Sequence, residues 1–169
     1  MNLSFGNSSN VEKVFSEILS QLSSGIRVRY INKERPWGGF IVIEEDDIEF
    51  FIYQFFPHLK KEDLGPARLS PKILIVAPNK RLSWQYHNRR AEIWKVIGGT
   101  VGVVTSESDI EGEKKMLKTG ELIELKNGER HRLIGLQDWG IVAEIWHHTN
   151  DAFPSDEDDI IRIQDDFGR

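Results

Sequence analysis

The sequence predicts an all-β protein, a sandwich or barrel, preceded by a single helix. From Arg27 onward, short extended runs follow one another with turn residues between them, and no second helix pattern interrupts them. Many short strands at this spacing are typical of β-sandwiches and β-barrels. The chain has 169 residues, which is enough for one domain with a substantial core.

The helix is predicted over residues 10–24, where apolar side chains recur at spacings of three and four. These positions share one helix face and are Val11, Val14, Phe15, Ile18, Leu19 and Leu22. Asn10 can cap the first turn, and Gly25 can end the helix. We therefore expect an N-terminal helical extension over residues 1–25, with a role in packing or in a dimer contact.

The rest of the chain, residues 26–169, is expected to be one β-domain. The predicted strands are "IRVRYI", "GGFIVIE", "IEFFIYQFF", "KILIVA", "LSWQYH", "EIWKVIGGTVGVVT", "KKMLK", "LIELK", "HRLIGL" and "GIVAEIWHH". Residues 57–71, "PHLKKEDLGPARLSP", are rich in proline and charge and are expected to form an inserted loop. The acidic tail after Pro154 ends in a short alternating run, "DIIRIQD".

Composition narrows the function classes. No apolar run approaches the roughly 20 residues that span a bilayer, and the N-terminus lacks the layout of a signal peptide, so we expect a cytoplasmic protein without a membrane partner. Cysteine is absent, so any metal must be held by histidine, carboxylate or amide ligands. The net charge of −5 disfavours a nucleic-acid partner, although a few local arginines could still bind an anionic small molecule.

Four polar residues have a spacing that suits a metal site. Gln85 and His87 lie two apart on a predicted strand and therefore share a face, and Glu92 follows on the neighbouring strand after the turn "NRR". His131 follows a second turn, "KNG", at the start of another strand. This nitrogen and oxygen set suits a divalent ion. Each residue alone is more often an ordinary polar residue of the surface or core, but two motifs in order favour the metal hypothesis.

Four passages of the chain resemble a known family. They are "RPWGGF", "LSWQYHNRRAEIWKVIGGT", "GERHRLIG" and "EDDIIRIQDDFGR", and together they cover most of residues 34–169. They are similar to the cupin superfamily and, more narrowly, to the C-terminal isomerase domain of the type II mannose-6-phosphate isomerase/mannose-1-phosphate guanylyltransferase family. No stretch resembles the Gly-rich nucleotide loop of the guanylyltransferase domain, so nucleotidyl transfer is not expected.

The resemblance implies a double-stranded β-helix barrel with a metal ion in its mouth. It implies zinc as the metal, with manganese, iron, cobalt or nickel as alternatives, and the ligands Gln85, His87, Glu92 and His131. The implied reaction is metal-dependent aldose–ketose isomerisation of a sugar phosphate, with mannose 6-phosphate and fructose 6-phosphate as the leading pair. Many cupins are dimers, so a homodimer is expected by analogy.

Three further residues are candidates for the chemistry. Arg90 could stabilise an enediolate or bind phosphate, whereas we interpret its neighbour Arg89 as a surface arginine paired with an acid. Lys72 could anchor phosphate or carry a proton, or it could be a solvent-exposed residue at a strand end. Glu144 lies between apolar residues on its strand, so it is expected to be a buried general base or a partner of Lys72 or of a ligand histidine.

Other polar and aromatic residues receive a structural interpretation. Arg132 is expected to face away from its neighbour His131, and His147 and His148 to be exposed. The aromatic residues Trp84, Tyr86, Trp94 and Trp146 are expected to face away from the ligands, in the core or at a dimer interface, although one ring could stack on a sugar.

The family often has a glutamine where this chain has Trp146, and the predicted loop at 57–71 is longer than in the family. These departures leave two alternatives open. One is an isomerase or epimerase of another phosphorylated or nucleotide-linked sugar, and the other is a non-catalytic, metal-containing sugar-binding cupin.

Overall fold

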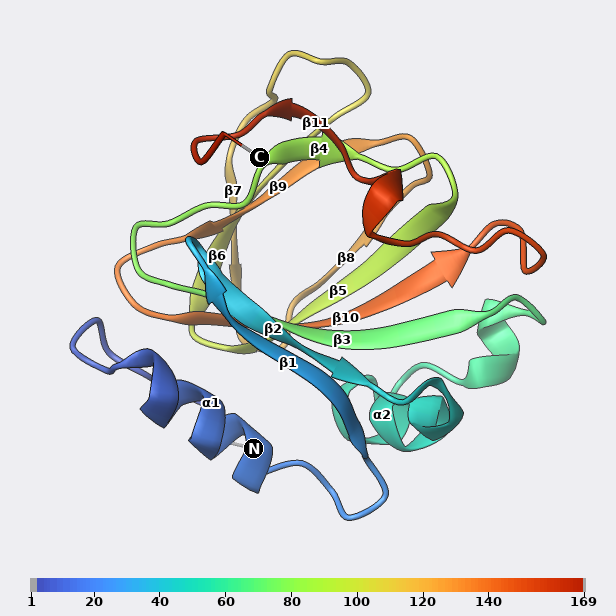
Figure 1. The fold of residues 1–169 in the computed structure, drawn as a ribbon, viewed down its shortest axis with the longest axis horizontal. Coiled ribbons are helices and arrows are strands. Elements are labelled where there is room, and N and C mark those ends of the chain that lie inside the picture. Colours follow the sequence, from blue (N-terminus) through green and yellow to red (C-terminus); the bar gives the residue numbers. More distant parts are fainter. Residues whose placement is uncertain (1–2, 169) are drawn as a thin grey trace.

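The computed structural model describes residues 3–168; residues 1–2 and 169, at the ends of the predicted extension and domain, lie outside that range. Two antiparallel sheets face each other to form a barrel (Figure 1). The six-stranded sheet has the order β1-β2-β3-β10-β5-β8, with β1 at Val28–Arg35, β2 at Gly38–Ile43, β3 at Leu69–Val76, β10 at Gly140–His148, β5 at Arg90–Gly98 and β8 at Leu122–Leu125. The five-stranded sheet has the order β11-β4-β9-β6-β7, with β11 at Ile161–Gln164, β4 at Trp84–Tyr86, β9 at Arg130–Gly135, β6 at Thr100–Ser106 and β7 at Lys115–Lys118. The predicted all-β class with an N-terminal helix is confirmed.

The predicted N-terminal helix is present but shorter than expected. Helix α1 spans Val11–Ser20, and the side chain of Asn10 accepts a hydrogen bond from the Lys13 amide at 2.8 Å, as the capping pattern predicts. Gly25 does not end the helix. A Cβ at Gly25 would come within 2.6 Å of the Phe50 ring, so this glycine serves close packing instead.

The run "IEFFIYQFF", predicted to be a strand, is mostly helix. Helix α2 spans Ile48–Phe55 and follows the 3-10 turn η1 at Glu45–Asp47. Its buried residues are Ile48, Phe51, Ile52 and Phe55, which recur at the spacing of one helix face, whereas Phe50 and Tyr53 are exposed. The prediction was wrong because a short apolar run fits a buried strand and a buried helix equally well.

Strands β2, β3, β10 and β5 of the six-stranded sheet are buried on both faces. The outer face of this sheet packs against α1 and α2, as Figure 1 shows below the sheet, through side chains such as Ile73 and Ile75. Alternate residues, such as Leu74 and Val76, face the barrel interior. This two-sided burial explains why the central strands read as continuous apolar runs. Lys72 lies two and four residues before Leu74 and Val76 on β3, so it shares their face and points into the barrel.

Part of the segment expected to be an inserted loop, residues 57–71, has regular secondary structure. The 3-10 turn η2 occupies Lys61–Leu64, and β3 already begins at Leu69. After β10 the chain crosses the mouth of the barrel through the 3-10 turn η3 at Glu157–Asp159, and β11 then pairs with β4.

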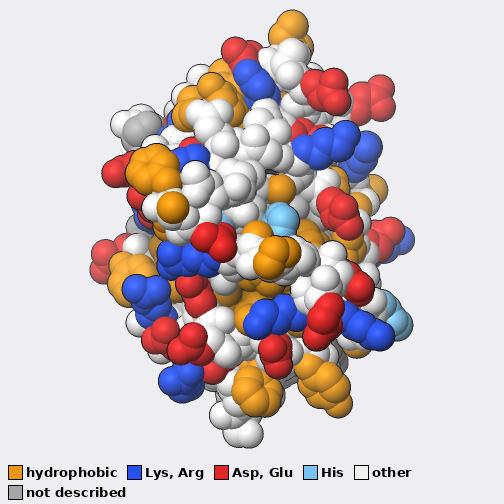
Figure 2. Space-filling view, turned by 90° about the vertical axis from the view of Figure 1, so that its right-hand side faces the viewer, with side chains coloured by type: hydrophobic (Ala, Val, Ile, Leu, Met, Phe, Trp, Pro, Cys, Tyr) orange, Lys and Arg blue, Asp and Glu red, His pale blue; other side chains and the backbone are white. Residues whose placement is uncertain are grey.

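No helix in the described part of the chain is long and apolar enough to cross a membrane. On the face drawn in Figure 2, acidic and basic side chains are interspersed, and hydrophobic side chains lie among them in small groups.

Candidate functional site

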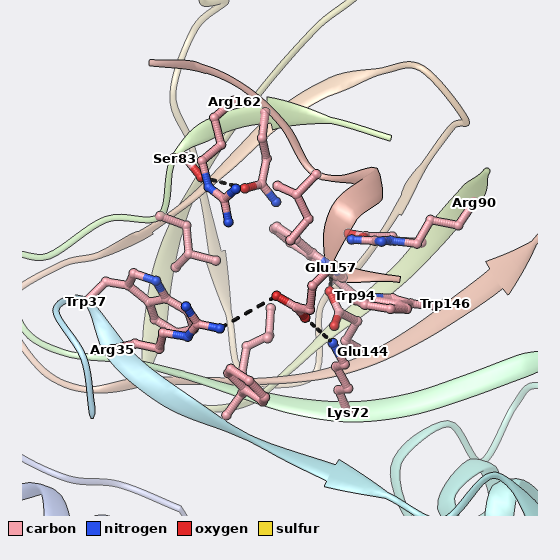
Figure 3. A pocket seen from close by; sticks show the side chains of 16 residues that line it. Arg35, Trp37, Lys72, Ser83, Arg90, Trp94, Glu144, Trp146, Glu157 and Arg162 are labelled. Carbon is pink, nitrogen blue, oxygen red and sulfur yellow. Dashed lines mark hydrogen bonds and ion pairs between the residues drawn. The ribbon is translucent and has the colours of Figure 1, made fainter. Parts of the chain in front are cut away.

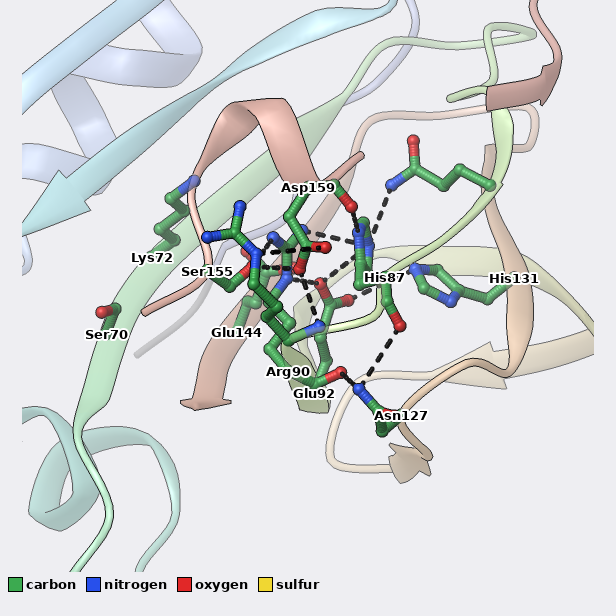
Figure 4. A network of polar contacts seen from close by, with 12 residues as sticks. Ser70, Lys72, His87, Arg90, Glu92, Asn127, His131, Glu144, Ser155 and Asp159 are labelled. Atoms are coloured by element: carbon green, nitrogen blue, oxygen red, sulfur yellow. Dashed lines mark hydrogen bonds and ion pairs between the residues drawn. The ribbon is translucent and has the colours of Figure 1, made fainter. Parts of the chain in front are cut away.

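Three of the four predicted ligands, His87, Glu92 and His131, converge inside the barrel (Figure 4), and Gln85 lies beside His87. Gln85 on β4 pairs in register with His131 on β9, His87 follows β4, and Glu92 arrives from β5 in the opposite sheet. All four are buried. The barrel therefore brings together residues that are up to 46 positions apart, as the spacing predicts.

The carboxylate of Glu92 lies between the two histidines. Its Oε1 is 3.2 Å from His87 Nε2, and its Oε2 is 3.4 Å from His131 Nε2. One donor atom from each of these three residues falls within a group no more than 4.8 Å across. This His–Glu–His cluster could bind a metal ion.

Backbone carbonyls fix which nitrogen of each histidine carries the proton. His87 Nδ1 lies 3.1 Å from the Asp159 carbonyl oxygen, and His131 Nδ1 lies 2.9 Å from that of Glu129. Because a carbonyl oxygen can only accept, each Nδ1 must carry the hydrogen. In a neutral ring Nε2 then presents a lone pair on the side of the Glu92 carboxylate, which is the arrangement found when histidine binds a metal.

Two buried atoms of this cluster have no hydrogen-bond partner. They are Glu92 Oε2 and His131 Nε2, which face each other. Burial lowers the pKa of His131 to about 4, so the ring is neutral at pH 7. Burial alone would raise the pKa of Glu92, but the charge of Arg90 helps to hold it well below its ordinary value. Two lone pairs thus face each other without a hydrogen between them, and a cation would satisfy both.

Gln85 lies at the edge of this cluster. Its Nε2 is 3.5 Å from His87 Nε2, and its Oε1 accepts a 2.6 Å hydrogen bond from the Ser83 hydroxyl. A ligating Gln85 would turn its oxygen toward the cluster, and Ser83 Oγ could then accept from the amide instead, because a hydroxyl both donates and accepts. The residues present therefore fit a divalent ion with mixed nitrogen and oxygen ligands.

Arg90 is buried beside the same atoms. Its Nε donates to Glu92 Oε1 at 2.7 Å, its Nη2 donates to His87 Nε2 at 3.0 Å, and its Nη1 donates to Ser155 Oγ at 2.7 Å. A cation bound to His87 would take the lone pair that Arg90 Nη2 uses. Cation binding would therefore free one guanidinium N–H for another acceptor.

A small pocket adjoins the cluster (Figure 3). Its volume is about 50 Å³, and Lys72, Arg90, Glu144 and Trp146 are among the residues that line it. Lys72 and Glu144 face each other across β3 and β10 in register. Trp146 lies between two cations: Lys72 Nζ is 3.4 Å and Arg90 Cζ is 3.5 Å from the ring centroid, which requires opposite faces of the indole.

Glu144 is the buried acid of the pocket. Its Oε1 accepts a 2.9 Å hydrogen bond from Trp94 Nε1. Burial and the nearby Glu92 carboxylate raise the pKa of Glu144 to about 8, so it is mostly protonated at pH 7. Burial lowers the pKa of Lys72, and Glu144 offsets only part of that effect. A carboxyl group that titrates near neutral pH is suited to general acid–base chemistry.

The expectation that the aromatic side chains face away is wrong for Trp94 and Trp146, which both line the pocket. Trp94 is two residues beyond Glu92 on β5, so strand alternation places it on the same interior face. Trp84 does lie outside the pocket lining and donates its indole N–H to the Asp109 carbonyl.

Arg89 pairs with an acid, Asp156, as expected, but its side chain is only 19 % exposed and also binds the Pro154 carbonyl, which anchors the C-terminal segment. His148 is buried rather than exposed, and its Nε2 lies 2.7 Å from Ser70 Oγ. His147 is only half-buried, and its Nε2 lies 2.8 Å from the Leu64 carbonyl.

Arg132, interpreted as structural, is buried outside the pocket and pairs with Glu111.

Several pocket residues were not singled out from the sequence. Arg35 lies in the quoted "RPWGGF" passage, and Glu157, Asp159 and Arg162 lie in "EDDIIRIQDDFGR". Arg35, Glu157 and Arg162 line the pocket, and Asp159 fixes the His87 ring. The signal was present, because both passages carry the family likeness and concentrate charged residues.

A family model described as "Mannose-6-phosphate isomerase C-terminal" matches residues 27–165. Mannose-1-phosphate guanylyltransferase ManC of Salmonella typhimurium is 28% identical over 162 residues, which is 95% of this chain and 27% of that protein. Xanthan biosynthesis protein XanB of Xanthomonas campestris is 28% identical over 167 residues, which is 97% of this chain and 30% of that protein. The chain thus spans less than a third of the length of these relatives.

Solved structures support the cupin fold. KdgF from Halomonas sp. aligns with a TM-score of 0.52 at 14% identity, covering 73% of this chain and 92% of that one. Vicilin from Corylus avellana aligns with a TM-score of 0.51 at 14% identity, covering 76% of this chain and 33% of that one. At this identity the similarity concerns the fold alone.

Proposed function

Since the chain belongs to the family of mannose-6-phosphate isomerase C-terminal domains, we propose that it isomerises a sugar phosphate with the help of a divalent metal ion. The leading pair is mannose 6-phosphate and fructose 6-phosphate. One observation carries the proposal: a buried His–Glu–His cluster, in which unpaired atoms of Glu92 and His131 face each other, adjoins a pocket that holds a carboxyl group titrating near pH 8. Isomerisation needs both a charge stabiliser and a proton carrier.

In this proposal Gln85, His87, Glu92 and His131 hold the metal, with zinc as the leading candidate. Bound there, a divalent ion would supply Lewis-acid polarisation of the substrate's oxygens. The chain's own part is to keep the two imidazoles in the required tautomer through the carbonyls of Asp159 and Glu129, and to exclude water from the cluster.

Glu144 is proposed as the proton carrier. Its carboxylate would remove the proton alpha to the substrate carbonyl, and the resulting acid would return that proton to the adjacent carbon. The pKa of about 8 leaves both protonation states accessible near neutral pH. Trp94 holds the carboxyl in place through its indole N–H, and the same ring packs edge-on against His131 with centroids 5.4 Å apart.

Arg90 and Lys72 are proposed to bind the negative charges of the reaction. Arg90 would stabilise the enediolate with the N–H that cation binding frees from His87. Lys72, buried in the pocket opposite Glu144, would anchor the phosphate. A homodimer and a cytoplasmic location remain predictions.

A second candidate is a cupin that binds a sugar phosphate without turning it over, or acts on a different one. It is favoured by Trp146, which fills the space between Lys72 and Arg90 and leaves a pocket of only about 50 Å³. Ligand pockets commonly have about 300–1,000 Å³, so the site must rearrange before it accepts a hexose phosphate.

The test combines metal analysis with an isomerase assay. Purified protein is loaded with each candidate metal, and the formation of fructose 6-phosphate from mannose 6-phosphate is followed with a coupling enzyme. We expect metal-dependent turnover that Glu144→Gln reduces sharply. Bound metal without turnover on any hexose, pentose or heptose phosphate would refute the isomerase and favour the binding protein.

A further inference from the structure

The C-terminal segment places a carboxylate inside the pocket, between two cations. Glu157 Oε1 accepts a 3.1 Å hydrogen bond from Lys72 Nζ, and Glu157 Oε2 lies 3.6 Å from Arg35 Nη2 (Figure 3). Lys72 comes from β3, whereas Arg35 ends β1. Three distant parts of the chain thus meet at this carboxylate.

The backbone that carries Glu157 is fixed on both sides by buried residues. Ser155 accepts from Arg90 and donates its hydroxyl to Asp159 at 2.6 Å, and its amide donates to a ring nitrogen of His148. The Asp159 carboxylate accepts from two backbone amides that follow His87. The Glu157 side chain, in contrast, is 51 % exposed. It can therefore leave the pocket while the segment stays anchored.

Two donor atoms on residues that line the pocket lack a hydrogen-bond partner. They are the buried atoms Arg35 Nε and Trp146 Nε1. The distance of 3.6 Å between Glu157 and Arg35 is also too long for a hydrogen bond. A phosphoryl group, with three acceptor oxygens and up to two charges, suits such a donor set better than one carboxylate does.

The charge of Glu157 and the small volume of the pocket also favour its replacement by a phosphoryl group. Burial would raise the pKa of Glu157, but the charge of Lys72 and its hydrogen bond outweigh burial and hold the pKa below its ordinary value, so this residue is anionic at neutral pH. With Glu157 in place the pocket holds only about 50 Å³. Removing the side chain from the pocket would open it at the same point at which it exposes two cations.

We propose that Glu157 is a displaceable internal anion: it occupies the place of a ligand's phosphoryl group between Lys72 and Arg35, and it leaves when a phosphorylated ligand binds. The choice of a phosphorylated ligand rests on the proposed function. Glu157 thereby sets a threshold for entry, because only an anion that binds the two cations better than this carboxylate can replace it. Arg35 becomes a ligand-binding residue.

The test measures the binding of inorganic phosphate to the full chain by isothermal titration calorimetry, at constant ionic strength maintained with chloride. Wild type, Glu157→Gln and Asp158→Asn are compared. Asp158 is exposed, lies on the same turn and does not line the pocket, so its variant matches the change in charge alone. If the Glu157 carboxylate occupies the phosphate site about nine-tenths of the time, only about one-tenth of the protein can bind phosphate, and the apparent affinity for phosphate is lowered about tenfold. We therefore expect phosphate to bind about tenfold more tightly to Glu157→Gln and unchanged to Asp158→Asn.

Equal affinity in all three proteins would overturn the proposal, as would equal tightening in both variants. Glu157→Ala removes the same carboxylate independently and must tighten binding too. Adding Arg35→Gln to Glu157→Gln must reverse most of the gain; if it does not, phosphate binds elsewhere and the proposal fails. Phosphate binding is measured without turnover, so the two ideas separate. Tighter phosphate binding in Glu157→Gln without isomerase activity refutes only the proposed isomerase function. Turnover without tighter phosphate binding in Glu157→Gln refutes only the displacement of Glu157.

Discussion

Replacing Glu144 by glutamine is expected to stabilise the metal-free protein and to reduce its turnover sharply. Glutamine keeps the shape of the side chain and an oxygen that can accept from Trp94 Nε1. It removes the acid whose pKa burial raises from 4.5 to about 8. Turnover should fall by roughly 10²–10⁴, the usual contribution of a positioned acid–base group.

The magnitude of the stabilisation follows from the raised pKa of Glu144. A carboxyl group whose pKa is higher in the folded state contributes most favourably below its unfolded pKa, and stability is lost as the pH rises through the folded pKa. Between about pH 4.5 and pH 8, the wild type should therefore lose about 1.4 kcal/mol per pH unit relative to the variant. At pH 7 the variant should be more stable by roughly 3 kcal/mol.

Urea unfolding of both metal-free proteins, from about pH 5 to about pH 9 at constant ionic strength, measures this difference. Other titrating groups are shared by the two proteins, so the difference in unfolding free energy isolates Glu144. Glu124→Gln, an exposed glutamate on β8, is the matched control and should show no such trend. A difference in unfolding free energy between wild type and Glu144→Gln that does not grow with pH would show that Glu144 does not titrate with a raised pKa.

Three further predictions concern the cluster itself. Gln85→Ala, His87→Ala and His131→Ala should each lower the bound divalent metal measured by elemental analysis, and unchanged content in all three would contradict the assignment. Arg90→Ala should retain metal, because Arg90 offers a cation no lone pair of its own, but its turnover should collapse; a fully active variant would remove Arg90 from the mechanism. The free energy of unfolding of the metal-free protein should fall by up to about 3 kcal/mol as the pH falls from 6.5 toward about 4. The reason is that the His131 ring, whose pKa is lowered in the folded state, takes up a proton more readily when the chain is unfolded. His131→Gln should flatten this part of the curve in thermal unfolding, and identical acid dependence would count against it.

The strands and the cluster could be predicted because they depend on spacing along the chain. Strand alternation places Gln85 and His87 on one face, and turn residues mark where the chain reverses toward Glu92 and His131. The same rule places Trp94 beside Glu92, so its position in the pocket was available from the pattern. The error came from assuming that tryptophans avoid a polar site.

Other features depend on contacts that a local pattern does not specify. Helix α2 follows from packing against the outer face of the sheet, and its apolar residues alone leave helix and strand equally open. The roles of Glu157 and Asp159 depend on where the C-terminal segment crosses the barrel. Nothing local in "EDDIIRIQDDFGR" says that it returns to β4 beside residues synthesised about 70 positions earlier.

That crossing has a consequence for biosynthesis. The proton on the His87 ring is positioned by the carbonyl of Asp159, which the ribosome adds only after all of the strands from β1 to β10. A nascent barrel can thus pair its strands before this imidazole is oriented.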